Sequence, residues 1–517
     1  MSERPDQRHR LRVGIDVGGT NTDAVVLDET DSVVATAKRP TSPDVTEGLR
    51  AALDAVLAEL DDPSLVTRVM LGTTHATNAI LERRALGRVA VLRLGLPATT
   101  SVPPLSDWPA DLRDVVAAGT AIVRGGHFVD GRPIAPLDTD AVKRFLAEVG
   151  SAADAVAVAG VFSPGSADQE KQVAEIIRAE LGDVAVSLSH EIGSLGLLER
   201  ENATVLNAAL YGVARDVTTA LQDALDSRGL KVETFFAQND GTLMAVDYAA
   251  RYPVLTIGSG PANSLRGAAY LSGVEDAIVA DVGGTSTDLG VLVGGFPRES
   301  AAAVEIGGVT TNFRMPDILS IALGGGTMVG AEPRSVGYRI GREALVFGGP
   351  TPTMTDAAVA AGRGTVGTHG VPDQWRDRLA EAVARADELV ADAVDRVALG
   401  KADRPLIAVG GGALLLAGRI PGASEVIRPR HAEVANAVGA AIALASGRLE
   451  TIVPTGNGGN ARAALIEKAK EEAAARAVAA GADPASVQIV ELSEIPLSYL
   501  PEPAVRLQVK AAGPLSR

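Results

Sequence analysis

An eight-residue stretch occurs twice in this chain and constrains its fold more than any other feature. The copies are residues 16–23 (DVGGTNTD) and residues 281–288 (DVGGTSTD), and they differ at one position, Asn21 against Ser286. Apolar runs precede and follow both copies, which is typical of a β-hairpin with small residues at its tip. One copy lies early in the chain and the other past its middle. The repeat therefore predicts two related lobes.

The residue types at these tips suit phosphate. Glycines let backbone N–H groups approach an anion, Thr and Ser hydroxyls add donors, and Asp can hold a divalent cation through water. We therefore expect one nucleotide between the lobes, although two ordinary glycine hairpins without a ligand are the alternative. The hairpin residues expected to bind it are Gly18, Gly19, Thr20, Asn21, Thr22, Gly283, Gly284, Thr285, Ser286 and Thr287.

Composition limits the classes of protein that fit. Aromatic residues are 3% of the 517 residues and hydrophobic residues 46%, so small aliphatic side chains must fill α/β layers. The net charge of -16 is spread along the chain and argues against nucleic acid or an anionic membrane as the main partner. The absence of Cys excludes disulfides, thiolate metal sites and a Cys nucleophile. With no apolar run long enough for a bilayer and no signal-like start, we expect a cytoplasmic protein.

Periodicity and turn residues predict the elements in order. Residues 11–37 give a hairpin and a third strand, 44–60 a helix, 66–71 a strand and 97–136 an irregular excursion. Residues 199–227 read as one long helix, 375–399 as another and 433–446 as a third. A helix at 461–480 and paired strands at 487–492 and 505–509 follow a Gly-rich linker. The predicted domains are residues 1–195, residues 196–450 and a small C-terminal α/β appendage at residues 451–517.

Residues 72–83 (GTTHATNAILER) predict a strand end turning into a helix N-terminus. Polar side chains beside free helix N–H groups can contact an anion or a polar substrate. His75 is therefore a candidate, and a buried helix-capping role is its equally good alternative. Charged residues cluster between 190 and 202, where a solvated helix start explains them as well as a site does.

These stretches, with residues 189–207, 258–262, 317–327, 350–356 and 410–412, resemble the hydantoinase/oxoprolinase family over roughly residues 10–445. The resemblance implies a two-lobed actin-like ATPase fold, built from duplicated ribonuclease H-like domains. It implies ATP-dependent opening of a cyclic amide such as a hydantoin or 5-oxoproline, through phosphorylation of the carbonyl oxygen. Some relatives are carboxylase subunits that phosphorylate a ketone instead.

Phosphoryl transfer is mostly positioning and charge neutralisation. We expect ATP and Mg²⁺ as cofactors, with Asp16 and Asp281 facing the metal through water. Gly324, Gly325 and Gly326 form a third Gly turn at the nucleotide, and Gly410, Gly411 and Gly412 pass close to the adenosine. The candidate catalytic residues are Asp16, Asp281, Asp23, Asp288 and His75, and the last four of them are candidates for the acid–base role.

Three functions fit this expectation. The first is an ATP-dependent lactam or hydantoin hydrolase subunit, the second a small-molecule kinase of the same fold, and the third a nucleotide-sensing scaffold subunit. The sequence also offers no Ser-His-Asp spacing and no His-rich metal set for the hydrolytic half, and it lacks most of the long C-terminal region of large family members. We therefore expect an oligomer in which a second hydrolase subunit completes the ring opening. The alternative is that a water held by Asp or Glu in the same cleft attacks the activated ring.

Overall fold

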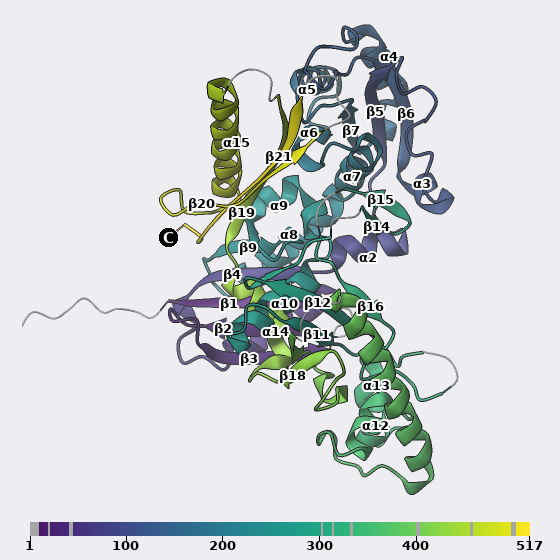
Figure 1. Ribbon diagram of the computed structural model, residues 1–517, viewed down its shortest axis with the longest axis vertical. Coiled ribbons are helices and arrows are strands. Elements are labelled where there is room, and N and C mark those ends of the chain that lie inside the picture. The colour runs from purple at the N-terminus through teal and green to yellow at the C-terminus, as the bar shows by residue number, and fades with distance from the viewer. Residues whose placement is uncertain are drawn as a thin grey trace, which may run out of the picture.

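The computed structural model describes residues 10–18, 21–40, 45–300, 303–312, 315–330, 334–399, 404–454, 459–497 and 503–516. Within these ranges nine strands form the larger sheet, in the order β20-β21-β19-β10-β9-β4-β1-β2-β3 (Figure 1). Its strands are β1 (Leu11–Val17), β2 (Asn21–Leu27), β3 (Val33–Pro40), β4 (Val66–Thr73), β9 (Glu233–Ala237), β10 (Leu243–Ala245), β19 (Ala445–Pro454), β20 (Gln488–Pro496) and β21 (Ala504–Gly513).

A second sheet repeats the topology of the first. In the described ranges it has six strands: β11 (Ile278–Val282), β12 (Thr287–Val293), β13 (Phe296–Pro297), β16 (Leu319–Ile321), β17 (Arg404–Val409) and β18 (Ala423–Ile427). β11 pairs antiparallel with β12 and parallel with β17, as β1 pairs antiparallel with β2 and parallel with β4. The orders β3-β2-β1-β4-β9 and β13-β12-β11-β17-β18 therefore correspond strand by strand, which confirms the predicted duplication.

Two helices lie between the sheets. α10 (Ser259–Ser272) packs on β11, β12 and β17, and α14 (Ala435–Ile442) packs on β1, β2 and β4. They cross in close contact because Gly267 and Gly439 have no side chains. A Cβ on Gly267 would lie 1.8 Å from the Ala435 carbonyl oxygen, and one on Gly439 would lie 1.9 Å from the Asn263 carbonyl oxygen. This glycine crossing joins the two halves of the duplication.

A separate α/β layer includes the predicted excursion at residues 97–136. Its parallel sheet has the order β6-β5-β7-β8, with β5 (Val89–Leu96), β6 (Ala117–Arg124), β7 (Ala155–Gly160) and β8 (Ala185–Leu188). The associated elements are α2 (His75–Glu82), α3 (Ala110–Val116), α4 (Thr139–Val149), α5 (Asp168–Leu181), α6 (Ser189–Ile192), α7 (Leu197–Ala209), β14 (Val304–Ile306) and β15 (Val309–Thr311). Residues 97–136 are therefore more regular than expected, because α3 and β6 lie within them.

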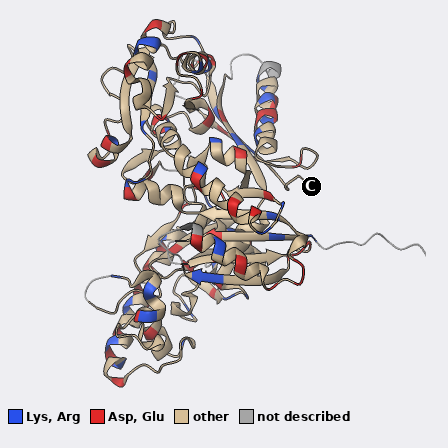
Figure 2. Ribbon diagram, turned by 180° about the vertical axis from the view of Figure 1, so that it is seen from behind, with Lys and Arg blue, Asp and Glu red and all other residues tan. Residues whose placement is uncertain are grey.

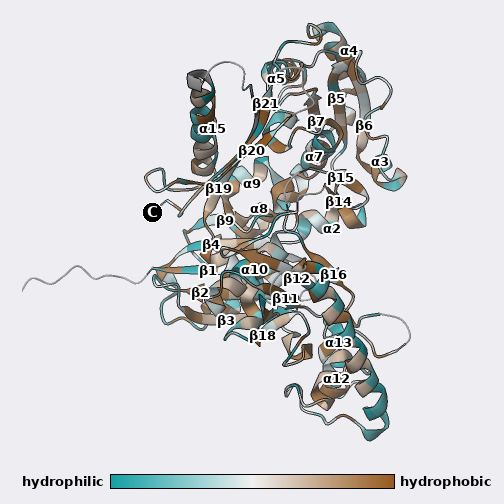
Figure 3. Cartoon of the chain, viewed as in Figure 1, coloured by the Kyte–Doolittle hydropathy of each residue, from teal (hydrophilic) through white to brown (hydrophobic). Residues whose placement is uncertain are grey.

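Seven further α-helices lie in the described part of the chain. They are α1 (Val45–Leu57), α8 (Tyr211–Asp226), α9 (Val246–Arg251), α11 (Ile340–Glu343), α12 (Met354–Ala360), α13 (Arg376–Ala398) and α15 (Gly459–Ala479). In Figure 3 much of the outer face of α13 is hydrophilic, while its buried side, including Leu379, Val390 and Val394, packs on the second sheet. Among the described residues, no helix is both long and apolar enough to cross a bilayer.

Two predicted helices differ in extent. The helix expected over 199–227 is two helices, α7 and α8, that meet at Leu210. The helix expected over 433–446 ends at Ile442, because Ala443 is extended (φ -70°, ψ 155°) and β19 begins at Ala445. Ladder pairing of β19 with all ten residues of β21 outweighs the helical propensity of the Ala-rich segment.

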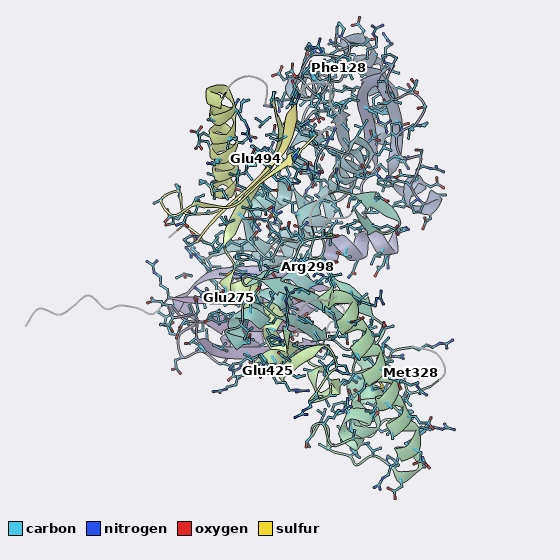
Figure 4. All side chains as sticks on the ribbon, in the orientation of Figure 1. Phe128, Glu275, Arg298, Met328, Glu425 and Glu494 are labelled. Atoms are coloured by element: carbon cyan, nitrogen blue, oxygen red, sulfur yellow. The ribbon has the colours of Figure 1, made fainter. Side chains whose placement is uncertain are left out.

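The C-terminal elements extend the first sheet. β19 pairs with β10 at Leu243 and Ala445, and then with β21, which pairs with β20. α15 covers them and carries both signs of charge (Figure 2). Arg462 of α15 forms an ion pair with Glu494 of β20, which Figure 4 labels beside this helix. The residue ranges predicted for the domains stay predictions. Strands from all three ranges belong to this one sheet.

Candidate functional site

The two hairpin tips face one cavity of about 580 Å³, which we call the hairpin cavity. Gly18 N–H donates to the Asn21 carbonyl (3.0 Å) in the first hairpin, and Gly283 N–H donates to the Ser286 carbonyl (2.9 Å) in the second. The volume lies in the range of small-molecule and cofactor sites. The tip residues that line it are Gly18, Asn21, Gly283, Gly284, Thr285 and Ser286.

The other predicted binding residues divide into four groups. Gly325, Gly410, Gly411 and Gly412 also line the hairpin cavity. Thr22 and Thr287 are fully buried outside its lining, and the Thr287 hydroxyl donates to the Leu323 carbonyl. Gly324 and Gly326 pack against the second hairpin tip but lie outside the lining of the hairpin cavity. Gly19 and Thr20 lie outside the described residues.

Backbone packing explains the glycines around the second tip. Gly325 and Gly326 N–H groups donate to the carbonyls of Gly283 (2.9 Å) and Gly284 (2.7 Å). Gly410 has φ +85°, and a Cβ there would lie 2.2 Å from Asp281 Oδ1. The turn at 410–412 therefore approaches the second hairpin more closely than a side chain would permit.

Each hairpin carries two carboxylates at opposite positions of its paired strands. Asp16 is opposite Asp23, and Asp281 is opposite Asp288, in the register of the strands. Asp16 and Asp23 are buried, and Asp281 and Asp288 are partly buried. Asp23 and Asp281 line the hairpin cavity, while Asp16 and Asp288 lie beside it.

Burial raises the pKa values of all four carboxyl groups, and neighbouring carboxylates add to the shift at Asp16 and Asp281. Burial and then the charge of Asp23 raise the pKa of Asp16 to about 7. Burial raises the pKa of Asp281 to about 6, although a hydrogen bond from the Ser264 hydroxyl opposes the shift. The pKa values of Asp23 and Asp288 are also raised, chiefly by burial. A cation or a hydrogen-bond donor in the cavity would stabilise the ionised forms.

Asp16 keeps one unsatisfied oxygen. Asn436 Nδ2 donates to its Oδ2 (2.9 Å), but its buried Oδ1 has no hydrogen-bond partner among the described residues. A buried unpaired carboxylate oxygen is costly, so this atom is suited to a ligand, a water or a metal. No set of three or more His, Asp or Glu residues in the described part of the chain is arranged to hold a metal. A Mg²⁺ here would complete its shell with water and phosphate oxygens, as this ion commonly does.

Sequence reasoning missed Lys38. This residue lies opposite Asp23 in the β2–β3 register, and its Nζ donates to Asp23 Oδ1 (2.6 Å) and to the Glu433 carbonyl (3.0 Å). It lines the hairpin cavity and places a cation between the first hairpin and the segment before α14. The available signal was a basic residue on the strand that follows the hairpin. Recognising its role required the pairing register of β2 and β3.

His75 is not at the hairpins. It begins α2 and lines a separate small cavity with Thr73, Ala76 and Thr256. Its Nδ1 is hydrogen-bonded to the Thr73 hydroxyl, and burial lowers the pKa of the imidazole. The structure therefore does not bring His75 together with the four carboxylates.

The carboxylate cluster predicts a pH dependence. The folded state keeps protons on Asp16 and Asp281 up to about pH 7 and 6, whereas unfolded carboxyls lose them near pH 4. Folded protein therefore binds more protons in this window, and the cluster's contribution to the free energy of unfolding falls as pH rises from 5 to 8. Urea denaturation in EDTA measures this. Asp281→Asn should reduce the fall relative to wild type, and an identical or steeper fall in the variant would contradict the assignment.

The chain is similar to two family models and to several known proteins. The model for the hydantoinase/oxoprolinase N-terminal region matches residues 12–181, and the hydantoinase/oxoprolinase model matches residues 200–367. The chain is 29% identical to the acetophenone carboxylase gamma subunit of Aromatoleum aromaticum, over 70% of this chain and 54% of that protein. It is 27% identical to caprolactamase subunit alpha of Pseudomonas jessenii, over 69% of this chain and 55% of that protein. The chain thus matches little more than half the length of these relatives.

A solved structure supports the fold. The crystal structure of ATP-dependent caprolactamase from Pseudomonas jessenii aligns with a TM-score of 0.78, at 20% identity, over 98% of this chain and 88% of that chain. Together with the repeated strand order, this confirms the two-lobed actin-like ATPase fold. The two family models cover most of both lobes, and the chain belongs to the hydantoinase/oxoprolinase family.

Proposed function

We propose that this chain is the ATP-binding subunit of an enzyme that opens a cyclic amide by phosphorylating its carbonyl oxygen. The observation that carries the proposal is that both hairpin tips and the turn at 410–412 line one cavity. The family membership and the subunit relatives support a nucleotide there and a partner subunit.

The residues of the hairpin cavity would have distinct roles. Backbone N–H groups of Gly284, Thr285 and Ser286 would contact the phosphates, and Lys38 would add positive charge. Asp16 and Asp281 would hold Mg²⁺ through water, and the metal would supply charge neutralisation for the transferring phosphoryl group. Amide resonance makes a lactam carbonyl a poor electrophile, and phosphorylation turns its oxygen into a leaving group.

A specific observation favours a second candidate. The acetophenone carboxylase gamma subunit is as similar to this chain as the caprolactamase subunit is. A carboxylase subunit would phosphorylate a ketone or a related carbonyl with the same hairpin cavity. A kinase or a nucleotide-sensing scaffold of this fold would also retain that cavity.

The products distinguish these candidates. With ATP, Mg²⁺ and a panel of hydantoins, lactams and ketones, we expect lactams to stimulate phosphate release by the purified chain. With the proteins encoded beside it, we expect one ring opened per ATP. Stimulation by ketones alone would support the carboxylase subunit, a stable phosphorylated product a kinase, and ATP binding without turnover a scaffold.

A further inference from the structure

A second cavity lies at the same edge of the first sheet as the hairpin cavity. It has a volume of about 120 Å³ and shares no lining residue with the hairpin cavity. We call it the β9 cavity, because the turn after β9 lines it together with residues 190–194, β19 and β21. β1 and β9 pair in parallel with β4, one on each of its two sides. The carboxyl ends of β1 and β9 are therefore two strand spacings apart, which is roughly 10 Å. β10 lies between β9 and β19 in this sheet (Figure 1).

Asn239 brings an unpaired donor to the β9 cavity. Its backbone N–H donates to the Leu255 carbonyl (2.7 Å), which fixes the turn, and its side chain is 4% exposed. The buried Nδ2 has no hydrogen-bond partner among the described residues. Buried polar groups are nearly always paired, so this amide is suited to a ligand that offers an acceptor.

His190 brings an acceptor to the same cavity. Its Nδ1 donates to Glu170 Oε2 (2.6 Å), and its side chain is 11% exposed. Glu170 also accepts from Gly160 N–H (2.7 Å) and from the Ser189 hydroxyl (2.6 Å). Burial alone would raise the pKa of Glu170, but these donors and the Arg200 charge hold it below its usual value. In the neutral imidazole, an ionised Glu170 keeps the proton on Nδ1, so that Nε2 carries the lone pair.

Several charged groups that line the β9 cavity form ion pairs. The pairs are Asp240 with Lys510 (2.8 Å), Arg448 with Glu299, Glu450 with Arg506 (3.0 Å) and Glu191 with Arg251 (2.5 Å). These ion pairs offer no free charge that could neutralise a charged ligand. The lining therefore favours a neutral ligand. The volume is also close to the about 150 Å³ of a cavity that takes one benzene-sized ring.

A lactam matches this arrangement. The ring holds its amide cis, so the carbonyl oxygen and the N–H project from the same edge, one acceptor beside one donor. We propose that the β9 cavity binds a neutral five- to seven-membered lactam, with Asn239 Nδ2 donating to the carbonyl oxygen and the lactam N–H donating to His190 Nε2. This inference rests on the proposed function for its reaction, but the recognition itself can be measured without turnover.

The test is ligand-observed NMR on the full chain with MgADP. The probes are 2-pyrrolidinone, 2-piperidone and caprolactam, each with its N-methyl derivative and the cycloalkanone of the same ring size. At least one lactam should bind wild type at least tenfold more tightly than its N-methyl derivative and its ketone. Asn239→Leu should weaken the lactam and its N-methyl derivative by a similar factor of about tenfold, because both have the carbonyl.

His190→Ala should give a different pattern. It should weaken the lactam about tenfold but leave its N-methyl derivative nearly unchanged, so that the two bind within about twofold of each other. Tyr248→Phe removes a hydroxyl from the same lining and should change neither affinity by more than about twofold. Melting temperature and ADP affinity report whether each variant is folded.

The outcomes separate this inference from the proposed function. If lactams stimulate ATP turnover but both variants bind them as wild type does, the β9 cavity is not their site and the proposed function stands. If lactams bind with the expected pattern but stimulate no turnover with any partner, the function falls and the site stands. No binding by any of the three lactams, or equal binding of a lactam and its N-methyl derivative, overturns the inference.

Discussion

Asp281→Asn is expected to lower MgATP turnover by about 10²- to 10³-fold, which corresponds to roughly 3 to 4 kcal/mol of transition-state stabilisation. Asp281 lines the hairpin cavity and is suited to holding a metal through water. The amide keeps the size of the side chain and an oxygen that can accept from Ser264, but it removes the charge. Phosphate release at saturating ATP and Mg²⁺ measures the effect.

The same substitution should not destabilise the ligand-free protein. Burial raises the pKa of Asp281 to about 6, so ionisation at neutral pH costs folding free energy that Asn avoids. We expect the melting temperature at pH 7.5 to equal or exceed that of wild type. Asp276→Asn, at an exposed position just before β11, is the matched control and should leave turnover unchanged. Full turnover in Asp281→Asn, or early melting, would contradict the role.

Gly267→Ala is expected to destabilise the protein by about 3 kcal/mol or more, because overpacking against backbone cannot be relieved by a side-chain movement. The new Cβ would lie 1.8 Å from the Ala435 carbonyl oxygen and 3.0 Å from Gly439 N. α10 and α14 would have to separate, and Ala435 and Asn436 at the start of α14 line the hairpin cavity. We therefore expect ATP binding to weaken as well. Urea denaturation and nucleotide titration measure both effects.

Gly212→Ala provides the control for Gly267→Ala. Gly212 lies in α8, and a Cβ there would meet no atom within 4 Å. Because Ala has the higher helix propensity, this variant should be as stable as wild type or slightly more stable, by up to about 1 kcal/mol. Equal stabilities for the two Ala variants would show that the crossing is not tightly packed.

The sequence predicted the hairpins and the turn at 410–412 because their chemistry lies in short, continuous motifs. Lys38 was missed because its role depends on strand register, which places it opposite Asp23. His75 lies in a motif beside the hairpin but points to another cavity, since the direction of α2 is set by tertiary packing. Asn239 and His190 are 49 residues apart, and nothing local indicates that they line one cavity.

The C-terminal strands were expected to form an appendage because a Gly-rich linker precedes them. A Gly-rich linker indicates where the chain can bend, but it does not indicate with which strands the following segment pairs. The connection to the first sheet depends on β10 pairing with β19 at Leu243 and Ala445, a contact between short segments about 200 residues apart in sequence. Pairing of this kind has no signature in composition or periodicity.

The larger sheet joins strands that are about 500 residues apart in sequence, and this has a consequence for synthesis. β1 begins at Leu11 and β21 ends at Gly513, so the sheet cannot be completed until residue 513 has left the ribosome. The second sheet lies entirely between Ile278 and Ile427 and closes earlier. Until the last strand arrives, β19 presents an unpaired edge, which is the kind of surface that attracts other chains and chaperones. The sheet that contains β1 is therefore completed after the second sheet.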